Sequence, residues 1–210
     1  MTKEEKVKEI IARLSKIYPH PHTSLLHSNP LQLLISTILS AQATDKLVNT
    51  VTPQLFQKYK NAQDFANADL AQLDKDITRV NFHFNKAKNI QAACKIIVEK
   101  YNGQVPDTME KLDALPGVAR KTANVVLGNA FHKAEGIAVD THVMRLSRKL
   151  NLTEAKDPVK IEQDLMKIVP REKWIDFSHL LINFGREYCP ARPHKCDNCP
   201  LADLCPEKSL

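Results

Sequence analysis

The sequence contains little glycine and few aromatic residues, and it lacks a long hydrophobic run. Only 5 of its 210 residues are glycine and 6% are aromatic, too few for an all-β sandwich, which needs many turns. No apolar run approaches the roughly 18 residues that cross a bilayer. The first six residues are mixed in charge and precede a helical pattern, not a signal-peptide core. We therefore expect a cytoplasmic protein with no targeting signal and no membrane partner.

The overall composition is that of a folded protein with a basic surface. Hydrophobic residues make up 43% of the chain and charged residues 26%, both ordinary values for a globular protein. The formal net charge is +6 and the pI is about 9.0. This balance suits a polyanionic partner such as nucleic acid, although solvated surface charge alone would give the same count.

Nearly every segment shows the spacing of an amphipathic helix, with apolar residues at steps of three and four. Helix-start signals precede most of these segments, namely Thr2 with Glu5, Asn29–Pro30, Asp45, Asp107 with Glu110, Asp140 and Asp157–Pro158. One helix is expected to stop at Gly103, and another to run from about Arg120 to Phe131. Because no stretch alternates as a strand would, the sequence predicts an all-α fold without internal repeats.

Four of the five cysteines lie close together near the C-terminus. Cys189, Cys196, Cys199 and Cys205 have the spacing C-x6-C-x2-C-x5-C, which in a reducing compartment favours a metal site over disulfides. Zinc sites usually join two C-x2-C pairs, and only one such pair occurs here. The spacing therefore favours an iron–sulfur cluster, with zinc or unligated thiols as alternatives. Cys94 falls on an apolar helical face and is expected to be a core residue.

Two basic features are candidate contacts for phosphate. Arg192, His194 and Lys195 lie between the clustered cysteines, where they are either phosphate contacts or ordinary exposed charges. The run LPGVARKTANVV, which begins at Leu115, lies between two helical patterns. A tight glycine hairpin that leads into a helix presents unpaired backbone N–H groups, which can bind one phosphate without sequence readout. In isolation, an L-P-G run favours a plain helix–helix turn.

Several separated motifs, taken in order, resemble those of the bacterial endonuclease III family of helix-hairpin-helix DNA glycosylases. They are LPGVARKTANVV, the run VDTHVMRLSRKL that contains Asp140, and the four-cysteine tail. The segments Ser40–Asp45 and Asn85–Ile90 also match, so the resemblance extends from about residue 25 to residue 205.

The resemblance implies a two-domain all-α fold with DNA bound in the cleft between the domains. A helical bundle of residues 22–133 would carry the helix-hairpin-helix at about 107–131. Residues 1–21 and 134–210 would form the domain that holds a 4Fe–4S cluster. The implied activity is excision of oxidised pyrimidines from duplex DNA by a monomer, with cleavage of the abasic strand through a lysine Schiff base.

Individual residues are carried over only where this chain matches the family pattern. Lys121 corresponds to the catalytic lysine and Asp140 to the catalytic aspartate. The implied DNA contacts comprise a gap-filling residue, a wedge, the hairpin and the cysteine loop, namely Gln42, Phe82, Leu115, Gly117, Ala119, Arg120, Arg192 and Lys195. Two departures stand out. Ala119 replaces the second hairpin glycine, so a left-handed backbone there would be strained. Asn81–Phe82–His83 matches the wedge segment loosely.

These residue types fit the implied chemistry. A damaged base must leave the stack before it can be excised, and Phe82 and Gln42 would offset part of that cost. The Lys121 amine can attack C1′ of the sugar, and Asp140 can stabilise the positive charge that develops there. The alternatives are a monofunctional adenine or mismatch-thymine glycosylase on the same scaffold, and a non-catalytic iron–sulfur DNA-binding module. The presence of Lys121 argues against the first alternative, and its pairing with Asp140 argues against the second.

Overall fold

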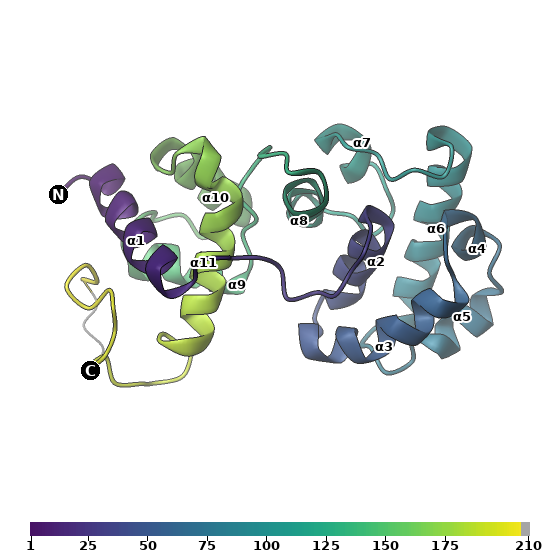
Figure 1. Cartoon of the computed structure of the whole chain (residues 1–210), viewed down its shortest axis with the longest axis horizontal. Helices are drawn as coiled ribbons and strands as arrows, with labels where there is room; N and C mark the ends of the chain where they lie inside the picture. The colour runs from purple at the N-terminus through teal and green to yellow at the C-terminus, as the bar shows by residue number, and fades with distance from the viewer. Residues whose placement is uncertain (207–210) are drawn as a thin grey trace. The chain divides into compact units, whose positions relative to one another are not determined.

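The computed structural model describes residues 1–206 and is helical, as predicted (Figure 1). Within these residues there is no strand, and no helix is long and apolar enough to span a membrane. The chain divides into two compact units. The terminal unit comprises Met1–His22 with Ala134–Leu210, and the middle unit comprises Thr23–Lys133. The domains implied by the resemblance, residues 22–133 and residues 1–21 with 134–210, remain a prediction.

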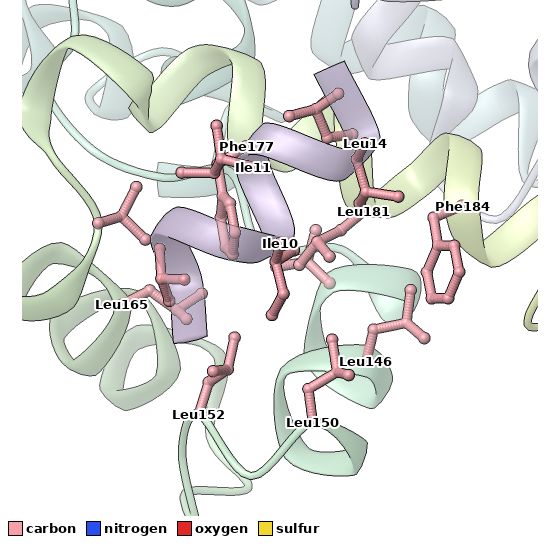
Figure 2. Packing of buried hydrophobic residues seen from close by; sticks show 14 of the residues in the cluster. Ile10, Ile11, Leu14, Leu146, Leu150, Leu152, Leu165, Phe177, Leu181 and Phe184 are labelled. Atoms are coloured by element: carbon pink, nitrogen blue, oxygen red, sulfur yellow. The ribbon is translucent and has the colours of Figure 1, made fainter. Parts of the chain in front are cut away.

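The terminal unit is built from both ends of the described chain. Its elements are α1 (Lys3–Ile17), α9 (Thr141–Lys149), α10 (Pro158–Ile168), the 3-10 turn η1 (Arg171–Lys173) and α11 (Trp174–Glu187). Helix α1 packs on α10 and α11, and α9 packs on both of these helices. Figure 2 shows the core that results, in which Ile10 and Leu14 of α1 meet Leu181 of α11.

Polar contacts reinforce this union of distant segments. The Nη1 atom of Arg13 donates to the carbonyl oxygen of Pro200 at 3.0 Å, and the same guanidinium forms an ion pair with Asp203. The Lys6 amine donates to the carbonyl oxygen of Leu150, also at 3.0 Å. Helix α1 therefore binds the C-terminal segment as well as packing on the core.

The middle unit is a helical bundle in which α2 and α6 each pack on several other helices. Its elements are α2 (Pro30–Ser40), α3 (Asp45–Lys58), α4 (Ala62–Ala66), α5 (Leu70–Asp76), α6 (His83–Tyr101), α7 (Met109–Asp113) and α8 (Arg120–Phe131). Helix α2 packs on α3, α6 and α8, while α4 and α5 lie against α6 (Figure 1). Cys94 of α6 is 1% exposed, which confirms it as a core residue, and burial raises the pKa of its thiol to about 12.

Most predicted helix starts are confirmed, and one is wrong. Thr2 and Glu5 form the capping box of α1, and Asn29 and Asp157 accept hydrogen bonds at the starts of α2 and α10. Asp107 does not cap α7. Thr108 occupies the cap position of α7. The Asp107 carboxylate instead forms an ion pair with the amine of Lys133, which follows α8.

Candidate functional site

The hairpin between α7 and α8 needs a glycine at Gly117 for two reasons. Its backbone is left-handed, with φ of +76°, a conformation that glycine adopts without the steric penalty of a Cβ. A Cβ at this position would also lie 2.9 Å from Cβ of Asn89 on α6. The hairpin is thus pressed against α6, and Gly117 is its tight point.

Ala119 does not have the left-handed backbone that would strain it. Ala119 has φ of −98° and ψ of 166°, an extended conformation open to any residue. It occupies the N-cap position of α8 and supplies no side-chain hydrogen bond. The amide N–H groups of the first helical turn therefore have no side-chain cap, and the helix dipole leaves positive charge at that end.

Lys121 is the second residue of α8, directly at this uncapped end, and its side chain is exposed. Arg120 precedes it and is half-buried. Leu115, predicted as a DNA contact, is only 2% exposed. Its side chain therefore belongs to the core, and only its backbone can face a ligand.

Asp140 begins α9 in the terminal unit as its N-cap residue. Its Oδ1 atom accepts a hydrogen bond from the amide of Val143 at 2.8 Å. The side chain is half-buried. The hydrogen bond to Val143 therefore fixes the orientation of the Asp140 carboxyl group at the start of α9.

Gln42 and Phe82 are both exposed and both left-handed, with φ of 54° and 57°. Phe82 is 60% exposed, which excludes a core role for its ring. The two turns are joined, because Nδ2 of Asn81 donates to the carbonyl oxygen of Gln42 at 3.1 Å.

The four clustered cysteines line one cavity of about 240 Å³ in the terminal unit. Its other walls include the apolar side chains of Leu146, Leu150, Phe184 and Leu201. Among the described residues, no three metal-binding side chains converge closely enough to hold a single ion. Burial raises the pKa of the Cys199 thiol, and the other three cysteines act in the same direction. Such a set of thiols is stable as thiolates only around a cationic centre.

Arg145 is a residue of this region that the sequence did not single out. Its Nη2 atom donates to the carbonyl oxygen of Cys189 at 2.6 Å, and Nη1 lies 3.7 Å from Sγ of the same cysteine. Arg145 also borders a basic cavity of about 550 Å³ with Arg148, Lys149 and Arg192. Lys195 is exposed on the same cysteine loop. The sequence around Arg145 does not indicate that it contacts Cys189, because the clustered cysteines lie more than 40 positions further on.

Comparison with known proteins identifies the superfamily to which the chain belongs. Residues 35–171 match the model of the HhH-GPD superfamily of base excision DNA repair proteins. The matched segment includes the hairpin, Lys121 and Asp140. A solved thermostable thymine-DNA glycosylase, 23% identical, shares the fold with a TM-score of 0.84.

Relatives with higher sequence identity identify the family within this superfamily. Endonuclease III of Synechocystis sp. is 52% identical over 205 residues, covering 98% of this chain and 94% of the relative. Endonuclease III of Escherichia coli K12 is 41% identical over 200 residues, covering 95% and 94%. A solved trapped covalent intermediate of an endonuclease III with DNA has a TM-score of 0.93 at 44% identity, covering 99% and 98%.

The chain therefore belongs to the endonuclease III family. It is a base-excision-repair glycosylase of oxidised pyrimidines with an associated AP lyase activity, and its family carries a 4Fe–4S cluster. The monofunctional and non-catalytic alternatives are set aside.

Proposed function

We propose that Lys121 is the nucleophile of both steps. Its amine attacks C1′ of the damaged nucleotide, the C1′–N bond breaks, and the base leaves with the electron pair and a proton. The nitrogen then forms a C=N bond to C1′ as the C1′–O4′ bond breaks, which opens the sugar ring and leaves O4′ with the proton lost from the amine. The resulting Schiff base loses a C2′ proton, and β-elimination breaks the C3′–O bond, so that the 3′ phosphate leaves with the electron pair. The observation that carries this proposal is the position of Lys121 at the exposed, uncapped start of α8, immediately after the hairpin. A solved relative described as a covalent endonuclease III–DNA intermediate supports it.

Asp140 is proposed to act by charge on the same sugar. Because Oδ1 accepts the cap hydrogen bond from Val143, the carboxylate is fixed in orientation before substrate binds. A carboxylate held in place can stabilise the positive charge that develops at C1′ without reorganising. It can also exchange a proton with the departing base.

The DNA would be held by backbone and cationic groups. The backbone N–H groups of the hairpin at Gly117 and Ala119, with Arg120 beside them, would bind one phosphate. Arg192 and Lys195 would contact phosphates from the cysteine loop, while Gln42 and Phe82 would fill the stack as the nucleotide leaves it. The protein would act on duplex DNA as a monomer and, as a repair enzyme, in the cytoplasm with the chromosome.

Cys189, Cys196, Cys199 and Cys205 would hold the 4Fe–4S cluster. Two observations support this assignment. The cavity has a volume of about 240 Å³, which exceeds the roughly 30 Å³ of one water molecule. The four thiols line its walls and, among the described residues, do not converge on a single metal ion. When bound, the cluster would supply folding free energy by joining the cysteine loop to α9. Purified protein is expected to be yellow-brown with about four iron atoms per chain. About one zinc and no iron would contradict this assignment.

A borohydride experiment tests the nucleophile. Reduction during reaction should link the wild-type chain covalently to DNA that carries thymine glycol or an abasic site. Lys121→Gln has no nucleophilic amine, so trapping and strand cleavage should vanish while DNA binding persists. Lys100→Gln, which removes an exposed lysine from the far end of α6, is the matched control and should trap normally. Trapping of Lys121→Gln at the wild-type rate would show that another amine reacts.

A further inference from the structure

Two turns of the middle unit hold non-glycine residues in a strained backbone conformation. Gln42 follows the last turn of α2, Phe82 precedes α6, and both have positive φ. Left-handed backbone disfavours residues with a Cβ, and such strain persists only where surrounding contacts fix the chain. These are also the two residues proposed above to enter the DNA stack. The contacts that hold their turns therefore bear on function.

Lys86 of α6 supplies two of these contacts. Its side chain is 6% exposed, and Nζ donates to the carbonyl oxygens of Leu39 and Ala41 at 2.8 and 2.6 Å. Both oxygens belong to the C-terminal end of α2, where helix carbonyls lack partners and the dipole favours a cation. Burial lowers the pKa of Lys86.

Asn81 and His83 fix the Phe82 turn from either side. Nδ2 of Asn81 donates to the carbonyl oxygen of Gln42 at 3.1 Å, and the His83 ring pairs with the carboxylate of Asp74 on α5. Asn81, just before α6, and Lys86, in its first turns, thus bind three carbonyl oxygens between residues 39 and 42. The turns that carry Gln42 and Phe82 form a single hydrogen-bonded unit, here called the paired turns.

We infer that Lys86 and Asn81 are positioning residues that preorganise the paired turns for extrusion of the damaged nucleotide. The inference rests on the proposed function of Gln42 and Phe82. Both side chains act through the backbone and neither needs to touch DNA. A pair of turns that is already ordered loses less conformational entropy when it enters the stack, so that extrusion becomes easier.

Single-turnover excision on two substrates tests this role. One duplex carries thymine glycol opposite adenine, and the other carries the same lesion in a bulge with no opposing base. An unpaired base needs less energy to leave the stack, so a defect in extrusion should affect mainly the first duplex. 2-Aminopurine beside the lesion reports the extrusion step by its fluorescence.

Three variants separate positioning from other effects. Lys86→Met keeps the length of the side chain but removes its donors, and a displaced contact of this kind commonly costs about 100-fold in rate. We expect excision from the paired duplex to fall about 10- to 100-fold, and from the bulge less than about threefold. Asn81→Ala removes one exposed donor and should act in the same direction, by about three- to tenfold. Lys95→Met is the control, because it removes the same charge from an exposed position of α6.

Each outcome decides the matter. Equal losses on both substrates would overturn the inference in favour of a general structural role, and unchanged rates would show that neither residue acts. If Lys86→Met fails to fold by circular dichroism, Asn81→Ala decides alone, since its side chain is exposed and Lys86 stays in place. A wild-type protein that neither excises nor is trapped would contradict the proposed function, not this inference.

Discussion

Replacing Gly117 by alanine adds one methyl group to the hairpin and meets two separate penalties. The left-handed backbone at φ of +76° disfavours a Cβ by about 1–2 kcal/mol. The new Cβ would also lie 2.9 Å from Cβ of Asn89, an atom fixed to the α6 backbone that cannot rotate away. Overpacking of this kind costs about 1–3 kcal/mol, so the expected total loss of stability is about 2–5 kcal/mol.

Gly103 provides the matched control for the first penalty. It has the same φ of +76°, and a Cβ added there has no neighbour within 4 Å. Gly103→Ala should therefore cost only the backbone penalty. Alanine also restricts the unfolded chain, which offsets about 0.4–1 kcal/mol of the loss in both variants. The difference between the two variants in urea unfolding isolates the clash with Asn89. Equal losses for the two variants would refute the packing argument.

The same variant tests the phosphate contact. A shift of the hairpin should weaken binding to damaged and undamaged duplexes alike, since phosphate contacts carry no sequence information. The slope of log binding constant against log salt should fall by about one. Fluorescence anisotropy at several salt concentrations measures both quantities. Wild-type affinity and slope in a destabilised Gly117→Ala would show that the hairpin does not hold a phosphate.

Three further predictions concern the terminal unit. Asp140→Asn keeps an oxygen for the Val143 cap but loses the charge, so excision should slow about 10²–10⁴-fold with little change in melting temperature. Cys199→Ala should lower soluble yield and iron content more than it alters residual excision per folded molecule, because metal binding supplies folding energy. Burial, followed by the nearby charge of His22, lowers the pKa of His179 to about 4. The unfolded chain therefore takes up the proton first, and stability should fall by about 2 kcal/mol between about pH 7.5 and about pH 5. His179→Phe should lack this fall in urea titrations, and an equal fall would contradict the assignment.

Local signals in the sequence predicted much of the fold. Arg120–Phe131 is helical as expected, because a hairpin glycine and an apolar period mark both its start and its face. The cap residues Asn29, Asp140 and Asp157 act within three residues of themselves, so their effect is visible in the sequence alone. The short helices α4 and α5 were not predicted, because five- and seven-residue helices depend on packing against α6.

The missed features all depend on distant partners. Lys86 lies in a polar run that predicts a surface residue, and its burial follows from the carbonyl oxygens of α2 more than 40 positions earlier. Asp107 pairs with Lys133 instead of capping its own helix. The candidate catalytic residues came from motif order and not from geometry, since no local pattern distinguishes a catalytic Asp140 from an ordinary N-cap.

The order of the units along the chain determines when each can fold during synthesis. Thr23–Lys133 leaves the ribosome as one uninterrupted segment, so the middle unit has all its helices once that segment has emerged. Helix α1 emerges first but finds its partners α10 and α11 last, at roughly 5–20 residues per second. A nascent chain that has emerged as far as Lys133 would thus combine a complete middle unit with an α1 whose apolar residues, Val7, Ile10 and Leu14, still face water. That helix is where a nascent-chain chaperone would be needed.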